Sequence, residues 1–177
     1  QIFLASRTGK AIRFSEKDVR EMGRTASGVR GFRLEKGDKV IAMEIADPKA
    51  IALSVTENGF GKKTFFNEYR LQSRGGKGII NVKVTDKNGK VVNVLTVQEE
   101  DEIIVVTNGG MVVRCPVNQI RTSGRNAQGV RVMRMKDGHK VAAAARVVEK
   151  EDDDEAAQLD LIEDDDEKES KKKKKKD

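Results

Sequence analysis

A unit of about 50 residues occurs three times in this sequence, and this repetition constrains the fold more than any other feature. Several sets of residues keep intervals of 50 and then 51 positions: Gly9, Gly59 and Gly110; Arg13, Lys63 and Arg114; Arg20, Arg70 and Arg121; Arg24, Arg74 and Arg125; Gly28, Gly78 and Gly129. An apolar residue precedes each arginine of the third set. A period of this length is typical of propellers and related repeat arrays.

Each unit contains four short runs rich in β-branched residues, with turn signals such as Asn88-Gly89 between them. Asn-Gly and Asp-Gly pairs supply the positive φ that tight hairpins need. We expect strands at residues 2–6, 10–14, 29–34 and 39–45; at 50–56, 62–66, 79–84 and 90–97; and at 103–107, 111–115, 130–135 and 140–148. The sequence therefore predicts an all-β fold of propeller-like blades, each with four antiparallel strands, over repeats 1–47, 48–97 and 98–148.

Two short segments are ambiguous in this pattern. Residues 16–21 are compatible with a short helical turn ahead of the first long loop. The four alanines from Ala142 to Ala145 favour a helix by intrinsic propensity, whereas their place in the repeat favours a strand. We give the repeat precedence and predict a strand there.

The charge is divided unevenly along the chain. The formal net charge is +6, but residues 1–148 hold 27 Lys and Arg against 15 Asp and Glu, so the repeats are basic and the tail is acidic. This asymmetry indicates a polyanionic partner for the repeats. The tail, 149–177, combines acidic runs with few apolar residues and is predicted to be disordered. Six lysines, Lys171 to Lys176, stand just before its last residue and are either native or added.

The second repeat contains a short basic loop with three glycines, Gln72-Ser73-Arg74-Gly75-Gly76-Lys77-Gly78. Glycines allow the backbone to approach a partner closely, and the two cations stand beside N–H groups that can face an anion. Phosphate is the anion that this chemistry suggests. The alternative is an ordinary solvated turn.

Catalytic and metal chemistry find little support in the sequence. Cys115 is the only cysteine, which excludes an intrachain disulfide and a cysteine cluster for a metal. His139, the only histidine, follows an Asp-Gly turn, and Tyr69 has an apolar role by its place in the repeat. We expect no catalytic residue, metal or cofactor in this segment. The chain starts at Gln1 inside a strand-like run, so we expect it to be part of a longer protein.

The repeats resemble the last three blades of the C-terminal domain of the DNA gyrase A subunit, which is a propeller-like β-pinwheel. The resemblance covers roughly residues 1–148 and rests on ordered motifs: Gly23-Arg24-Thr25-Ala26-Ser27-Gly28-Val29-Arg30-Gly31, Glu57-Asn58-Gly59-Phe60-Gly61-Lys62-Lys63-Thr64, the loop from Gln72 to Gly78, and Gly124-Arg125-Asn126-Ala127-Gln128-Gly129-Val130. The family's signature box reads Gln-Arg-Arg-Gly-Gly-Lys-Gly and belongs to its first blade. Because Ser73 replaces an arginine here, we interpret residues 72–78 as an echo of that box in a later blade.

The resemblance implies nonspecific binding and wrapping of double-stranded DNA, which lets a type II topoisomerase introduce negative supercoils. It also implies that the domain assembles with the rest of the gyrase A chain and with the gyrase B chain in an A2B2 heterotetramer. ATP and magnesium would be used elsewhere in that enzyme, and the location would be the bacterial cytoplasm, at the nucleoid. Two alternatives remain open: the corresponding domain of topoisomerase IV, and a propeller that binds other proteins.

The recurring cations are the residues that we expect to contact DNA. A cation at one repeat position lies at the same place on each blade, so we expect a basic stripe on a common rim that also carries the loops before Gly28, Gly78 and Gly129. The predicted DNA-contacting set is Arg13, Arg20, Arg24, Arg30, Lys62, Lys63, Arg70, Arg74, Lys77, Arg114, Arg121, Arg125 and Arg131. We also expect the acidic tail to compete with DNA for this stripe, since tethering gives it a high effective concentration.

Overall fold

The computed structural model describes residues 1–136 and 138–147, which belong to one compact unit, Gln1–Val147. The predictions for the tail, 149–177, and for the end of the last strand at Val148 lie outside the described residues. Within the described part, the all-β prediction is confirmed. Its helical elements are three single turns of 3-10 helix: η1 Glu16–Asp18, η2 Phe66–Glu68 and η3 Val117–Gln119.

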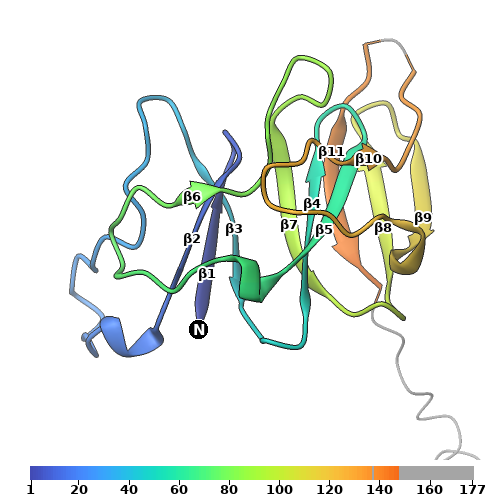
Figure 1. Cartoon of the computed structure of the whole chain (residues 1–177). Coiled ribbons are helices and arrows are strands. Elements are labelled where there is room, and N and C mark those ends of the chain that lie inside the picture. Colours follow the sequence, from blue (N-terminus) through green and yellow to red (C-terminus); the bar gives the residue numbers. More distant parts are fainter. Residues whose placement is uncertain (137, 148–177) are drawn as a thin grey trace, which may run out of the picture. The chain divides into compact units, whose positions relative to one another are not determined.

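Three antiparallel β-sheets follow one another along the chain (Figure 1). The first has the order β3-β1-β2-β6, from β1 Ile2–Ser6, β2 Lys10–Phe14, β3 Val40–Ile45 and β6 Ile79–Ile80. The second has the order β10-β5-β4-β7, from β4 Ile51–Thr56, β5 Phe60–Phe65, β7 Val91–Val97 and β10 Val130–Arg131. The third, in the part that the structure describes, has the order β11-β8-β9, from β8 Glu102–Thr107, β9 Val112–Pro116 and β11 Val141–Arg146.

The fourth strand of a sheet comes from the following repeat, and this differs from the prediction. The two-residue strand β6 belongs to the second repeat yet pairs with β2 of the first, and β10 of the third repeat pairs with β5 of the second. Of the strands predicted at 79–84 and 130–135, only the first two residues of each form a strand. The strand predicted at 29–34 is wrong, because residues 29–34 form no strand. The described chain has no earlier sheet for residues 29–34 to complete.

Two local predictions hold. The short helical turn forms at Glu16–Asp18, where the Ser15 hydroxyl caps it by accepting from the Lys17 amide. The alanine run is strand β11, paired with β8, so tertiary pairing overrides the helix propensity of alanine. The longest described helix has three residues, so the structure shows no helix able to span a membrane in this part of the chain.

Apolar clusters fill the space between neighbouring sheets. One contains Phe3, Phe66 and Tyr69. The Phe3 ring meets the rings of Phe66 and Tyr69 edge to face, with centroids 5.2 and 4.8 Å apart. Burial raises the pKa of Tyr69, and its hydroxyl donates to Asn81 Oδ1 at 2.6 Å. Tyr69 is therefore a core residue, as predicted. The other large cluster, around Leu53 and Val105, lies between the second and third sheets.

Candidate nucleic-acid interface

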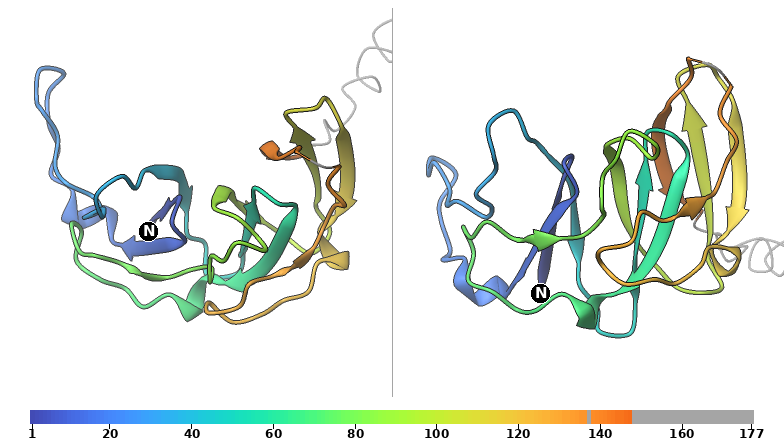
Figure 2. Two further views of the ribbon diagram at one scale, coloured as in Figure 1. Left: turned by 90° about the horizontal axis from the view of Figure 1, so that it is seen from above. Right: turned by 45° about the horizontal axis from the view of Figure 1, so that its top comes forward.

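Two long segments run along the outer edges of the first and second sheets. Each begins after a 3-10 turn, η2 or η3, and crosses beside the preceding sheet as β6 or β10 (Figure 1). Isolated parallel bridges, Arg13 to Leu71 and Lys63 to Thr122, fix the start of each segment against that sheet. Figure 2, in its left view, shows both segments on the same side of the sheets. These outer segments, residues 70–83 and 121–134, contain the predicted loops before Gly78 and Gly129.

Glycine is required where each outer segment meets the sheet. Gly78 has φ +66°, and a Cβ atom there would lie 2.5 Å from the Ala11 carbonyl oxygen. Gly129 has φ +87°, and its Cβ would lie 2.7 Å from the Gly61 carbonyl oxygen. Such contacts exclude any side chain, and positive φ disfavours one. The repeated glycines therefore serve close packing of main chain on main chain.

The loop before Gly28 does not share this arrangement. Gly28 also has positive φ, at +80°, but no atom lies within 4 Å of its Cβ position. The segment after Gly28 pairs with no strand in the described residues. The first loop thus pairs with no sheet edge in the described residues, and its place on a common rim stays a prediction.

Arg74 and Arg125 hold their own outer segments against the preceding repeat. Arg74 Nη1 donates to the Arg30 carbonyl at 3.2 Å, and Arg125 Nη1 donates to the Ile80 carbonyl at 3.1 Å. Arg30 and Ile80 occupy equivalent repeat positions, so the same hydrogen bond from an arginine to main chain forms twice. Arg74 Nε also donates to the Asp18 carbonyl at 2.8 Å. Both side chains are half-buried, and each guanidinium group donates to main chain of the preceding repeat.

The box-like loop uses its backbone in the same way. The Gln72 amide donates to the Arg13 carbonyl at 2.9 Å, and the Gly75 amide donates to the Gly31 carbonyl at 2.7 Å. These N–H groups therefore bind the preceding repeat and do not face solvent together as an anion cradle. The side chain of Lys77, in contrast, is exposed.

Three predicted DNA-contacting cations are used inside the fold. Lys62 is 1% exposed and donates from Nζ to the Gly124 and Arg125 carbonyls, both at 2.9 Å. Lys63 is 2% exposed and its Nζ pairs with Glu99 at 2.5 Å. Arg13 is half-buried, and its Nη1 donates to the Phe66 and Tyr69 carbonyls, at 2.6 and 3.0 Å.

The assignment of Lys62 and Lys63 to the DNA interface is therefore wrong, because neither ammonium group reaches the surface. Burial lowers the pKa of Lys62 to about 8. Arg13 is committed to packing between repeats. Arg114, in the same repeat position as Arg13, is exposed but forms an ion pair with Glu102.

Besides Arg114, seven of the predicted cations are exposed: Arg20, Arg24, Arg30, Arg70, Lys77, Arg121 and Arg131. Arg70 and Arg121 follow η2 and η3 at equivalent positions on the two outer segments. Arg131 lies on β10 with its guanidinium carbon 5.5 Å from the centroid of the Phe60 ring, and Lys87 lies 5.7 Å from the same centroid. Such stacking places a cation while leaving its donors directed outward.

An exposed row of cations that the predicted set lacks also keeps the repeat spacing. Arg33, Lys83 and Arg134 stand at intervals of 50 and 51 residues, and all three are exposed. The Arg33 amide donates to the Gly76 carbonyl and the Lys83 amide to the Ala127 carbonyl, at 2.9 and 3.2 Å. These hydrogen bonds place Arg33 and Lys83 beside the loops before Gly78 and Gly129, and Arg134 ends the second outer segment. The spacing that identified the other rows was sufficient to find this one.

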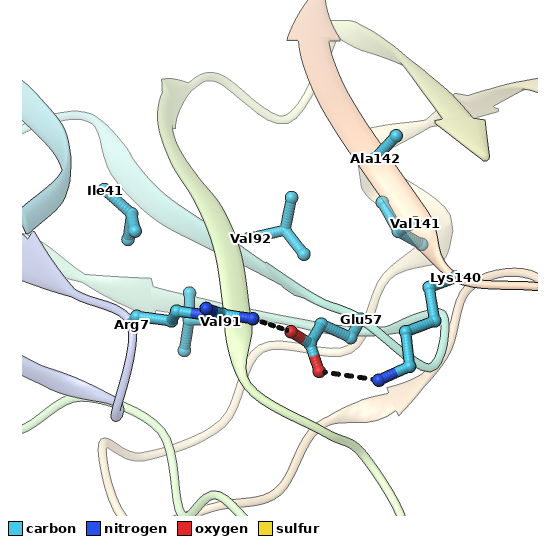
Figure 3. A pocket seen from close by; sticks show the side chains of 8 residues that line it. All are labelled: Arg7, Ile41, Glu57, Val91, Val92, Lys140, Val141 and Ala142. Carbon is cyan, nitrogen blue, oxygen red and sulfur yellow. Dashed lines mark hydrogen bonds and ion pairs between the residues drawn. The ribbon is translucent and has the colours of Figure 1, made fainter. Parts of the chain in front are cut away.

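A further row of lysines lies at the opposite edge of the sheets. Lys39, Lys90 and Lys140 immediately precede the edge strands β3, β7 and β11, and all are exposed. Glu57 bridges two repeats here, accepting from Arg7 at 2.7 Å and Lys140 at 3.4 Å (Figure 3). Partial burial opposes its ionisation, but these cations hold the pKa of Glu57 below its ordinary value. The adjoining cavity of about 250 Å³ is lined mainly by aliphatic side chains and these charges.

Metal coordination has no support in the described residues 1–136 and 138–147, which contain no cluster of three or more His, Cys, Asp or Glu side chains placed to share an ion. The prominent chemistry of this surface is therefore its exposed cations.

Comparison with known proteins decides the family. The model of the DNA gyrase C-terminal domain, a beta-propeller, matches residues 1–47, 51–98 and 101–147. This chain belongs to the DNA gyrase C-terminal domain family. The propeller-like fold and the resemblance stated from the motifs are confirmed by this match.

Relatives and solved structures agree with the gyrase assignment. The DNA gyrase A subunit of Staphylococcus epidermidis is 46% identical over 143 residues, and that of Staphylococcus aureus is 43% identical; each alignment covers 80% of this chain and 16% of the relative. A structure of a DNA gyrase A C-terminal domain has a TM-score of 0.77 at 28% identity, covering 83% of this chain and 50% of that one. The C-terminal domain of a DNA topoisomerase IV has a TM-score of 0.81 at 25% identity, covering 91% and 51%. This gyrase-family chain thus spans a small part of the length of its curated relatives.

Proposed function

We propose that this domain binds duplex DNA along the outer segments of its sheets and wraps it, with little dependence on base sequence. The observation that carries this proposal is the set of exposed cations that recurs in register along the two outer segments. Phosphate contacts from side chains of this kind position DNA but carry no base information. A row of cations on successive sheets suits a bent duplex, as in other proteins that wrap DNA by backbone contacts.

The proposed contact set differs from the one that spacing predicted. It comprises Arg20, Arg24, Arg30, Arg70, Lys77, Arg121 and Arg131 from that prediction, together with Arg33, Lys83 and Arg134. The half-buried Arg74 and Arg125 support the loops that carry these cations, and so act on DNA indirectly.

In the larger protein, wrapping would give the bound DNA segment a fixed handedness for ATP-driven strand passage and negative supercoiling. The relatives are DNA gyrase A subunits, and from the resemblance we expect the partners to be the rest of that chain and the gyrase B chain, in the bacterial cytoplasm at the nucleoid. ATP and magnesium would be used by other parts of that assembly, and this segment would contribute DNA binding without a catalytic residue.

The experiment compares two triple variants that remove the same charge from opposite edges of the sheets. One replaces Arg33, Lys83 and Arg134 by alanine, and the control replaces Lys39, Lys90 and Lys140 by alanine. Affinity for a random-sequence duplex is measured by fluorescence anisotropy over a series of salt concentrations. Each lost phosphate contact flattens the slope of log K against log salt by about 0.9, so the outer variant flattens it by up to about 2.7.

The control variant keeps the slope of the unmodified protein, because its lysines lie at the edge away from the outer segments. Equal flattening by both variants would mean that DNA responds to total charge and not to the outer segments, and would refute the proposed interface. A duplex of defined sequence serves as a second probe and gives the same ranking of the three proteins.

A further inference from the structure

A buried ammonium group holds the loop of the second outer segment. Lys62 lies on β5 and is almost fully buried, and its Nζ donates to the Gly124 and Arg125 carbonyls, both at 2.9 Å. Two residues further along the same strand, the Thr64 hydroxyl donates to the Ser123 carbonyl, also at 2.9 Å. Three successive carbonyls of the outer segment therefore accept hydrogen bonds from side chains of one strand.

The first outer segment is packed at the same place without a charge. Ile12 occupies in the first repeat the position that Lys62 has in the second, and it is equally buried. It lies against Gly76, where a Cβ atom would be 3.4 Å from the Ile12 Cδ1 atom. An apolar side chain therefore suffices to pack an outer segment on its sheet. Because burying a charge is costly, packing alone does not explain Lys62, and buried charges of this kind are candidates for a functional role.

The surroundings of Lys62 disfavour its charged form. Burial has the largest effect and lowers the pKa of Lys62 to about 8. Glu68, on η2, opposes this effect, and Arg125, on the outer segment, adds to it. The exposed Glu68 side chain also flanks the same loop, since its Oε2 lies 3.6 Å from the Cβ position of Gly124. Lys62 is therefore in a position where it exchanges its proton close to neutral pH.

The loop that Lys62 holds lies between two exposed cations of the proposed DNA contact set. Arg121 precedes the loop, and Arg131 follows it on β10, where it pairs with Phe60. Near its start, the Ser123 amide donates to the Lys63 carbonyl at 2.8 Å. Lys62 thus supplies two of the hydrogen bonds that position the main chain between the two arginines.

We propose that Lys62 is a positioning residue for DNA binding and that the domain takes up a proton at Lys62 when it binds duplex DNA, an inference that rests on the proposed function. The charged form makes charge-assisted hydrogen bonds to the loop, and such bonds are stronger than neutral ones. Phosphates that lie along Arg121 and Arg131 favour the charged form, because an anion stabilises a nearby cation. By linkage, the proton and the DNA therefore each promote the binding of the other.

The affinity for DNA should consequently fall as pH rises. In the limit where only the charged form binds, the competent fraction drops from about 0.9 at pH 7 to about 0.1 at pH 9, so the affinity weakens by up to about tenfold. The contribution of Lys62 to stability has the opposite sign, because a lowered pKa makes the free energy of unfolding rise over the same range. The change at Lys62 that weakens DNA binding thus does not unfold the domain.

The first test measures the affinity for a random-sequence duplex by fluorescence anisotropy at pH 7 and pH 9, at one ionic strength. Lys62→Met removes the charge and the two hydrogen bonds, so it binds at both pH values about as weakly as the unmodified protein does at pH 9. Lys62→Arg keeps a charge that is not lost in this range, so it binds well at both. The control Lys39→Met removes an exposed lysine away from the outer segments and follows the unmodified protein.

The second test measures the proton itself and needs no substitution. Isothermal titration calorimetry with the same duplex at pH 8, in phosphate and in Tris buffer of matched ionic strength, gives the number of protons taken up from the difference between the two enthalpies. The unmodified protein takes up as much as about half a proton more than Lys62→Met, which keeps every other titratable group.

Equal affinity of the unmodified protein at pH 7 and pH 9, or equal proton uptake by the unmodified protein and Lys62→Met, would overturn the proposal. Absence of DNA binding at every pH would refute the proposed function, and this inference with it.

Discussion

The buried ammonium group of Lys62 makes the stability of this domain depend on pH above neutrality. Its folded pKa is about 8, against an ordinary value of 10.5, because burial disfavours the charged form. Between these values the unfolded chain binds more protons than the folded chain, so the free energy of unfolding rises with pH. A shift of about 2.5 units corresponds to about 3 kcal/mol, most of it gained between pH 8 and 10.

The variant Lys62→Met isolates this contribution, since methionine fills similar space without a charge. It also leaves the Gly124 and Arg125 carbonyls without their donor, which costs about 1–3 kcal/mol at every pH. Below pH 7 the cost of the two unpaired carbonyls is offset in the variant, because methionine does not carry the charge that Lys62 buries. The difference in stability between the unmodified protein and the variant therefore grows by about 3 kcal/mol from pH 7 to above pH 10.

Chemical denaturation followed by circular dichroism at a series of pH values measures both proteins. Other groups titrate in this range, but they affect the two proteins equally and cancel in the difference. Lys77→Met is the control, because Lys77 is exposed and the same substitution there removes no buried charge. Parallel curves for Lys62→Met would refute the reasoning, since they would show that the ammonium group is not destabilised in the folded state.

Two further outcomes follow from the outer segments. Gly78→Ala lowers the free energy of unfolding by about 2–3 kcal/mol, because the new Cβ atom lies 2.5 Å from a carbonyl oxygen and the residue has positive φ. The control Gly23→Ala places its Cβ atom in open space and changes the free energy of unfolding by less than about 1 kcal/mol in the same denaturation assay. Arg74→Ala lowers stability by about 1 kcal/mol through its lost main-chain bonds, while Lys77→Ala leaves stability unchanged and flattens the salt dependence of DNA binding by about 0.9. A larger salt effect from Arg74 than from Lys77 would contradict the separation of supporting from contacting cations.

The repeat spacing predicted the three strands that each repeat contributes to its own sheet, because hairpin turns and alternating apolar residues are local signals. It did not predict that Ile79 and Ile80 would leave their own repeat to pair with β2, since the partner of an edge strand is decided by the packing of whole repeats. The same limit applies to the cations. Lys63 and Arg70 recur equally well in the sequence, yet one is buried against Glu99 and the other is exposed.

Burial of a recurring cation is a property of the side chain's surroundings, and spacing alone carries no information about them. The row of Arg33, Lys83 and Arg134 shows that regular spacing also does not say where an exposed row lies. Its spacing was as regular as that of the other rows, and only the backbone hydrogen bonds of Arg33 and Lys83 placed these two residues beside the outer segments. The rows that spacing identifies therefore need the fold to sort them into supporting and exposed sets.

The exchange of outer strands also determines how the chain can fold and be divided. The pairing of Lys10 with Ile80 joins residues 70 positions apart, so the first sheet cannot be completed until most of the second repeat has been ordered. Folding should therefore proceed as overlapping pairs of repeats, with a long loop to close at each step. Cleavage after Val97, at the apparent end of a repeat, would remove β10 and leave β5 as an unpaired edge strand. The independent folding unit of this array is therefore larger than the unit that its sequence repeats.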